Sequence, residues 1–162
     1  MKPPTKIIGV TGHRELLHSK SEVRQTLHES LTFLRQEKGY NKVITGMALG
    51  FDTLVAQVCI DIGMPYIAAL AFESQADKWN THDNDWHKHL LSKAENVKRI
   101  STGGWENWKY LKRDTWIVEN CDLLLAYLNE GKGRTSGTGF TVSEAERLGK
   151  PWRNVFDLVV RD

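Results

Sequence analysis

The sequence predicts an α/β fold, a three-layer sandwich with a mostly parallel sheet and helices on both faces. Short β-branched runs alternate with longer amphipathic stretches along all 162 residues, and two glycine-bearing segments each lie between a strand-like run and a helix-like run. Alternating strands and helices are typical of a parallel sheet, because each parallel connection needs a crossover. This length suits one hydrophobic core, so we expect a single domain over residues 1–162.

The first strand and helix set the pattern that the rest of the chain repeats. A β-branched run from Ile7 to Thr11 precedes a stretch from Ser21 to Lys38 in which apolar residues recur at three- and four-residue steps. That period places one apolar face against a sheet. Further strands are expected at residues 42–45, 66–71, 97–101, 123–128 and 154–156, and further helices at 52–62, 85–94, 108–120 and 141–148. This alternation of strands and helices along the chain is typical of a Rossmann-like domain.

Polar or glycine-rich segments follow four of the expected strands, at residues 11–14, 46–52, 72–75 and 129–141. In an open parallel sheet, ligands bind outside the carboxyl ends of the strands. Glycine lets backbone amides approach a ligand closely, and the free amides at the start of a helix suit a phosphate. The sequence therefore predicts a site for a phosphorylated small molecule. The sequence contains neither GxGxxG nor GxxxxGK(S/T). It therefore does not support assignment to the dinucleotide dehydrogenases or the P-loop hydrolases.

Individual side chains in these segments suit parts of such a ligand. Arg14 directly follows a strand, and its guanidinium can hold a phosphate through two parallel hydrogen bonds, with His13 beside it. Asp52 either caps the second helix or contacts a ribose hydroxyl, and Thr138 and Thr141 either cap a helix or bind phosphate. The expected ligand-binding residues are Gly12, His13, Arg14, Gly46, Gly50, Asp52, Glu73, Trp79, Ser136, Gly137, Thr138, Gly139 and Thr141.

Tryptophan is abundant, with six residues in the chain. We expect most of them in the core or at an interface. Trp79 differs because it follows the polar segment 72–75, so it either packs or stacks on a base.

A metal site is not expected. His82, His87 and His89 lie near Asp83 and Asp85, but none of the standard zinc spacings occurs. We therefore expect a polar segment there, and neither a metal nor another cofactor.

Composition predicts a soluble cytoplasmic protein without a membrane partner. No apolar run approaches the roughly 20 residues of a membrane helix, and no secretory signal begins the chain. Cys59 and Cys121 are expected to be buried thiols. The net charge of +2 favours no nucleic acid partner, and the basic cluster Lys109, Lys112 and Arg113 is either a binding face or a solvated surface.

Several of these motifs together resemble the SLOG superfamily of Rossmann-like domains, over nearly the whole chain. Residues 11–14 resemble the first-strand motif of its YpsA-like branch, as do Lys78-Trp79 and the stretch Arg113 to Asn120. Residues 46–53 and 136–141 are similar to the two glycine motifs of DNA processing protein A, another branch. The resemblance implies a domain that binds or senses a nucleotide or a nucleotide-derived molecule.

The same resemblance leaves two alternatives and implies self-association. One alternative is a nucleoside-monophosphate N-glycosidase, as in the LOG branch, where a glutamate follows the second glycine motif. Here Thr141 stands at that glutamate's position, so Glu73 or Glu144 would have to supply a carboxylate and the catalytic residues stay unassigned. The other alternative is single-stranded DNA binding. Superfamily members often dimerise, and we expect a homodimer or a larger homo-oligomer.

Overall fold

A computed structural model describes residues 4–159, and its centre is a six-stranded sheet in which every strand pair is parallel. The strand order is β4-β3-β2-β1-β5-β6. The strands are β1 (Ile7–Gly12), β2 (Lys42–Thr45), β3 (Tyr66–Leu70), β4 (Asn96–Arg99), β5 (Leu123–Tyr127) and β6 (Trp152–Asn154). The predicted α/β Rossmann-like class is confirmed, with the order reversing between β1 and β5.

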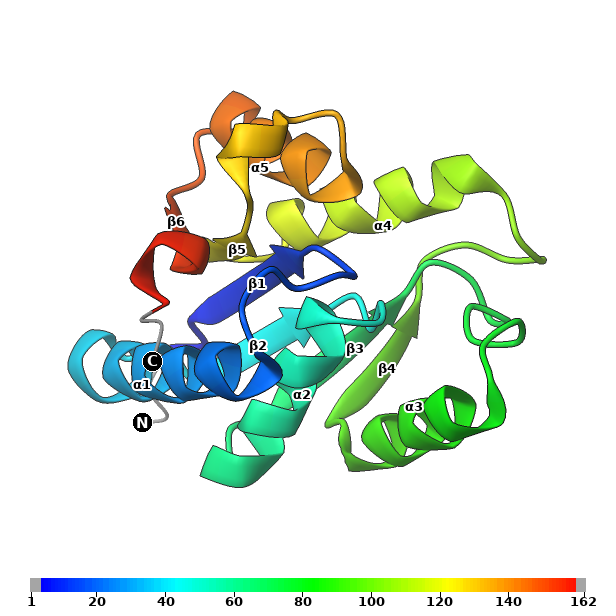
Figure 1. Cartoon of the computed structure of the whole chain (residues 1–162), viewed down its shortest axis with the longest axis horizontal. Helices are drawn as coiled ribbons and strands as arrows, with labels where there is room; N and C mark the ends of the chain where they lie inside the picture. Colours follow the sequence, from blue (N-terminus) through cyan, green and yellow to red (C-terminus); the bar gives the residue numbers. More distant parts are fainter. Residues whose placement is uncertain (1–3, 160–162) are drawn as a thin grey trace.

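Helices cover both faces of this sheet (Figure 1). On one face lie α1 (Lys20–Lys38), α2 (Phe51–Ile62) and α3 (Thr81–Lys93), and on the other lie α4 (Asn107–Glu119) and α5 (Gly137–Arg147). Two short 3-10 helices, η1 (Glu130–Lys132) and η2 (Val155–Leu158), complete the described chain. Helices α1 and α2 pack together, as do α4 and α5. Within residues 4–159, no helix is both long and apolar enough to cross a membrane.

Side-chain caps explain where the sequence misplaced three element boundaries. Ser136 Oγ accepts a hydrogen bond from Gly139 N, so α5 begins at Gly137 and not at residue 141. Asn80 caps α3 in the same way, so this helix begins at Thr81. The last strand ends at Asn154, whose side-chain oxygen accepts hydrogen bonds from the amides of Leu128 and Phe156 and turns the chain into η2.

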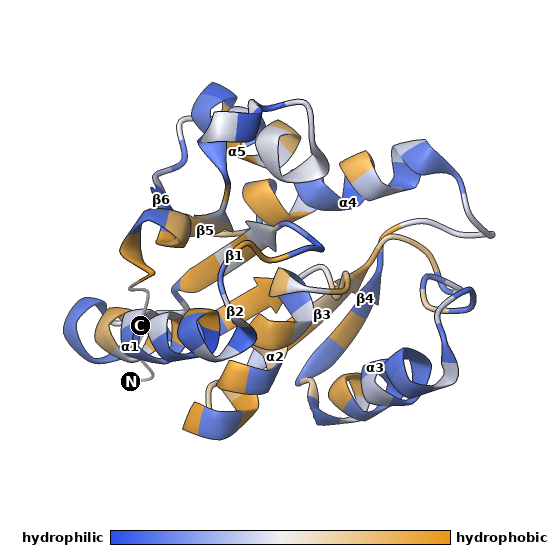
Figure 2. Ribbon diagram, in the orientation of Figure 1, coloured by the Kyte–Doolittle hydropathy of each residue, from blue (hydrophilic) through white to orange (hydrophobic). Residues whose placement is uncertain are grey.

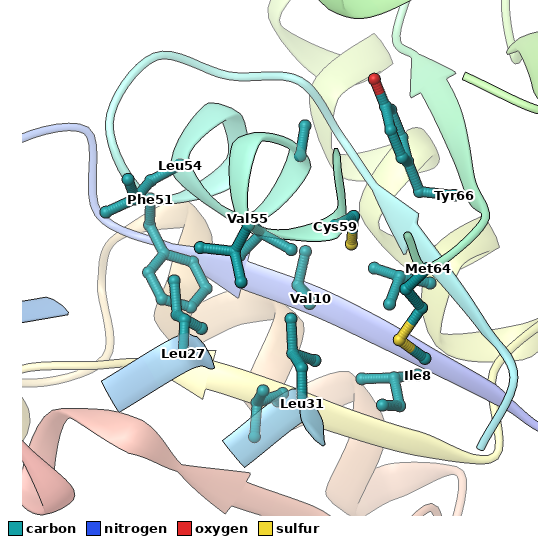
Figure 3. Close-up of a cluster of buried hydrophobic side chains, with 14 of the residues drawn as sticks. Ile8, Val10, Leu27, Leu31, Phe51, Leu54, Val55, Cys59, Met64 and Tyr66 are labelled. Atoms are coloured by element: carbon teal, nitrogen blue, oxygen red, sulfur yellow. The ribbon is translucent and has the colours of Figure 1, made fainter. Parts of the chain in front are cut away.

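The core lies mainly between the sheet and the pair α1 and α2. Apolar residues line the central strands and the inner helix faces (Figure 2). Ile8 and Val10 of β1 pack against Leu27 and Leu31 of α1 in one continuous buried cluster (Figure 3). A smaller cluster under α4 and α5 fills the opposite face. The sheet is thereby fixed on both sides, which gives the carboxyl ends of its strands a rigid support.

Leu31→Ala is expected to lower the free energy of unfolding by about 2–5 kcal/mol, because this fully buried side chain would leave a cavity beneath α1. Urea denaturation monitored by circular dichroism measures the change. Phe33→Ala on the same helix is the matched control, since Phe33 is 47% exposed. Equal losses for the two variants would contradict the placement of the core.

Candidate functional site

A cavity of about 420 Å³ lies at the carboxyl ends of the central strands, beside the point where the strand order reverses. Open α/β sheets bind ligands at this position. Its other walls come from the segments that follow β2 and β3, from the N-terminus of α5 and from α4. From the predicted set, the residues that line it are Gly12, His13, Arg14, Asp52, Trp79, Ser136, Gly137 and Thr138.

Three other predicted residues lie behind the lining and shape the walls. Gly50 has a φ of +86°, and a β-carbon there would lie 2.2 Å from the Arg14 carbonyl oxygen. A β-carbon on Gly139 would lie 2.4 Å from the carbonyl oxygen of Arg134. Thr141 is buried, and its hydroxyl donates to the Gly137 carbonyl at 2.8 Å. These residues let two loops approach α2 and α5 closely.

The two glutamates that the glycosidase alternative needs lie outside the lining. Glu73 pairs with Arg99 on β4, and its side chain is largely exposed. Glu144 pairs with Arg147 at 2.8 Å and accepts a hydrogen bond from Thr115. The carboxyl groups that do line the cavity belong to Asp52 and Asp114.

The start of α5 presents free amides to the cavity. Phe140 N donates the first intrahelical hydrogen bond, to the Ser136 carbonyl. Ser136 Oγ accepts a hydrogen bond from the Gly139 amide. The amides of Gly137 and Thr138 come before these bonds, in the first turn, where backbone donors have no partner inside the helix. Both residues line the cavity, so this end of α5 offers donors and a partial positive charge.

Arg113 is the central site residue that sequence reasoning did not assign. For the basic cluster Lys109, Lys112 and Arg113, the sequence predicts either a binding face or a solvated surface. Arg113 and Lys109 are only 4% and 3% exposed, so these two side chains do not form a solvated surface. Arg113 Nη1 donates to the Gly46 carbonyl at the end of β2, and Nε donates to Asp114 Oδ1 at 2.7 Å. In residues 4–159, Nη2 donates no hydrogen bond. Arg113 thus lines the cavity while the N–H groups of its Nη2 are not used by hydrogen bonds within the described residues.

Gln75 is a second residue that the sequence did not single out, although it lies in the predicted segment 72–75. Its side-chain oxygen accepts from Ala71 N at 2.9 Å, and its side-chain nitrogen donates to the carbonyls of Gly46 and Met47 at 3.0 and 3.2 Å. These bonds join the end of β3 to the first glycine segment. A buried glutamine after a strand is the signal that could have identified it.

Asp52 lies at the bottom of the cavity and does not cap α2, whose N-cap is Gly50. Its Oδ2 accepts a hydrogen bond from Ala48 N at 3.3 Å, whereas its buried Oδ1 has no partner in the described structure. Burial raises the pKa of Asp52 to about 7, against the opposing effect of the Arg113 charge. Burial also raises the pKa of Asp114. One carboxyl oxygen of this cavity-lining residue is therefore buried without a hydrogen-bond partner in the described structure.

His13 is a neutral group in this structure. Its Nε2 accepts a hydrogen bond from Asn129 N at 3.0 Å, which places the ring proton on Nδ1. Burial and the nearby Lys132 charge lower the pKa of His13. The imidazole therefore adds no positive charge beside Arg14, which is exposed and forms no ion pair within residues 4–159.

Aromatic side chains form the outer part of the cavity. Trp79 packs edge-on against His87, with ring centroids 5.1 Å apart, and also lines the cavity. Trp105 lines it too and is 61% exposed. Lys109 holds the Trp105 loop, because its Nζ donates to the carbonyls of Thr102 and Gly104 at 2.7 Å each. None of the six tryptophans, which all lie within residues 4–159, is fully buried, and Trp86, Trp105 and Trp108 are 36%, 61% and 51% exposed, so the core half of the expectation is wrong and the interface half stays a prediction.

The histidine segment belongs to α3. His87 is buried, which lowers its pKa, and its ring packs against Trp79. Among the residues that the structure describes, no group of three histidine, cysteine, aspartate or glutamate side chains is arranged to hold a metal ion.

Fold and cavity together define an α/β domain with a crevice at its topological switch point. The chain belongs to the YspA SLOG family, whose model matches residues 10–150. The resemblance to the SLOG superfamily is thereby confirmed. No curated protein matches the sequence.

Solved structures share the fold at low sequence identity. DNA processing protein A from Streptococcus pneumoniae superposes with a TM-score of 0.67 at 16% identity, covering 91% of this chain and 49% of that one. The Helicobacter pylori protein of that name, described by its single-stranded DNA binding mode, gives 0.64 at 15% identity, covering 91% and 63%. The molybdenum cofactor carrier protein of Chlamydomonas reinhardtii gives 0.56 at 14% identity, covering 92% and 75%. The chain therefore spans about half the length of the Streptococcus protein.

Asp52→Asn is expected to change how stability depends on pH. The folded-state pKa of about 7 lies above the value of about 3.9 in an unfolded chain, so the folded state holds this proton more tightly. The resulting stabilisation is complete below about pH 4 and is lost as the pH rises through 7. The difference in free energy of unfolding, wild type minus variant, should fall by up to roughly 4 kcal/mol between pH 4 and pH 8.

Urea titrations at several pH values measure this difference, in which contributions from other groups cancel. Asp77→Asn, at an exposed position, is the control and should give a flat difference. A flat difference for Asp52→Asn would show that its carboxyl ionises as in water.

Proposed function

We propose that the cavity binds a nucleotide or a nucleotide-derived phosphorylated small molecule, and that the domain is a binding or sensing module. The observation that carries this proposal is the set of hydrogen-bond donors that line this one cavity. Arg113 offers its free Nη2, α5 offers the amides of Gly137 and Thr138, and Arg14 adds an exposed guanidinium. A phosphate is the ligand group that such a donor set suits best.

The aromatic lining of the same cavity suits a base. Trp79, Trp105 and Tyr110 line it, with the Tyr110 ring centroid 5.9 Å from Arg113 Cζ, and aromatic rings stack on any nucleobase. Asp52 lines the cavity as well, and its carboxyl group is the acceptor that we propose for a ribose hydroxyl. The cavity volume of about 420 Å³ lies in the range typical of small-molecule sites.

Two finer features belong to the same proposal. We propose that the protein forms a homodimer or a larger homo-oligomer, supported by the exposed Trp108 and Leu111 on α4.

Turnover of a nucleotide would need a carboxyl group at the sugar. Asp52 or Asp114 would then be the catalytic carboxylate, in place of Glu73 and Glu144. Release of a free base from any nucleotide during the binding experiment would establish the glycosidase alternative.

Arg14→Ala is expected to abolish stabilisation by the preferred nucleotide. At a hundredfold excess over Kd, a ligand adds about 2.7 kcal/mol to the free energy of unfolding and raises the melting midpoint by several degrees. Thermal melts against mononucleotides, dinucleotides, cyclic nucleotides and ADP-ribose derivatives measure the shift. Arg24→Ala is the matched control, since this arginine pairs with Asp61 on the surface. A nucleotide that stabilises wild type and Arg14→Ala equally would contradict the proposal.

Single-stranded DNA binding is the second candidate, and exposed aromatic and basic residues favour it. Trp108 is 51% exposed with Lys112 Nζ 5.8 Å from its ring centroid, and Lys78 Nζ lies 6.0 Å from the ring centroid of Trp105. Stacking platforms flanked by cations suit single strands. The Helicobacter neighbour is described as binding such DNA.

Trp108→Ala separates the two candidates, because Trp108 does not line the cavity. If DNA is the ligand, the variant should weaken the binding of a fluorescent oligonucleotide by roughly 1–3 kcal/mol, and affinity should fall steeply with salt. Our leading proposal predicts that oligonucleotide binding is weak and that Trp108→Ala leaves nucleotide binding unchanged. Tight, salt-sensitive oligonucleotide binding that Trp108→Ala weakens would favour the DNA reading.

A further inference from the structure

A second cavity, of about 380 Å³, adjoins the first across the loop that follows β1. His13 and Arg14 line both cavities. The second cavity lies on the β5 side of this loop, where Tyr127 and Asn129 contribute its wall. A ligand anchored in the first cavity therefore has a neighbouring space that begins at the Arg14 guanidinium.

The loop that separates the two cavities is held in place, so the second cavity exists before any ligand binds. The Tyr127 hydroxyl accepts hydrogen bonds from the amides of Leu17 and His18 at 3.1 and 3.2 Å. With both lone pairs used, its own proton goes to His18 Nδ1, 2.7 Å away. The Phe51 amide also donates to the His13 carbonyl at 3.2 Å, which ties the loop to α2.

Two cations at the second cavity lack partners. Within residues 4–159, neither Arg14 nor Lys132 forms an ion pair or a side-chain hydrogen bond. Lys132 lies close enough to His13 for its charge to act on that ring. Two unpaired cations that line one cavity with a neutral imidazole suit a diphosphate better than a single phosphate.

The remaining walls suit a sugar. Glu15 supplies carboxylate acceptors for hydroxyl groups, and the Asn129 side-chain nitrogen donates no hydrogen bond within the described chain. The Asn129 side-chain oxygen is already used, because it accepts from Gly131 N at 3.2 Å. Leu17 and Phe156 add apolar surface for the carbon face of a ring. Hydroxyl partners beside apolar surface are what a pyranose or furanose ring requires.

We propose that the ligand is a nucleoside diphosphate that carries a sugar on its terminal phosphate. The nucleoside and first phosphate occupy the first cavity, the diphosphate passes Arg14 toward Lys132, and the sugar occupies the second cavity. This inference rests on the proposed function, since it extends the same site. The inference names the class of ligand and assigns sugar binding to the second cavity.

Isothermal titration calorimetry with two matched series tests the proposal. The first series is AMP, GMP, CMP and UMP, and the second is ADP-ribose, GDP-mannose, CDP-glucose and UDP-glucose. For the preferred base, the diphosphate sugar should bind at least about tenfold more tightly than the monophosphate, since it gains a charge-assisted contact and the sugar contacts. This affinity ratio is the quantity to compare between variants.

Two variants act on the second cavity, and one serves as a control. Lys132→Ala removes a cation, and Leu17→Trp fills the cavity from a side chain that is largely exposed. Both should reduce the affinity ratio toward one. Lys98→Ala, on the edge strand β4, should keep it. If Leu17→Trp fails to fold by circular dichroism, Lys132→Ala at its exposed position decides alone.

The outcomes separate this inference from the function on which it rests. Monophosphate binding without any gain from the diphosphate sugar would overturn the inference and leave the proposed function standing. A gain that survives both Lys132→Ala and Leu17→Trp would also overturn it, because the sugar would then lie elsewhere. If no compound of either series binds, the proposed function and the inference fail together.

Discussion

The buried Arg113 guanidinium is the interaction on which the site depends. It reaches from α4 to the carbonyls of Gly46 and Ala69 at the ends of β2 and β3, and it pairs with Asp114. Gln75 contacts the same Gly46 carbonyl. Removing one partner of a buried ion pair typically costs about 3–5 kcal/mol. The walls of the cavity are therefore fixed by the same group that offers a donor to its interior.

The sheet topology explains why these groups meet. Connections leave β1 and β5 toward opposite faces, so a crevice opens between their carboxyl ends. The loop after β1 lies in that crevice and contacts α2 on one side and Tyr127 of β5 on the other. One loop thus forms part of both cavities. Arg14 on this loop lines both cavities, while Arg113 of α4 lines the first cavity and Lys132 of η1 lines the second.

Periodicity predicted the parallel sheet and its helices because the amphipathic pattern repeats through the chain. The same reasoning predicted that segments after the strands form one site, and Gly12, Arg14 and Thr138 do line one cavity. The roles of Arg113 and Gln75 could not be predicted, because each depends on carbonyls that are distant in sequence, such as Gly46. Helical spacing cannot show which charged side chain of α4 faces inward. Nor could the sequence show that Glu73, in the segment after β3, pairs with Arg99 of β4 and lies outside the cavity lining.

A crystal structure of the protein with the tightest-binding nucleotide of the panel tests the central claim most directly. Our account predicts a phosphate within hydrogen-bonding distance of Arg113 Nη2 and of the Gly137 and Thr138 amides, with the base beside Trp79. A phosphate bound at the exposed Lys112 and Trp108 surface, with the cavity filled by water alone, would contradict it.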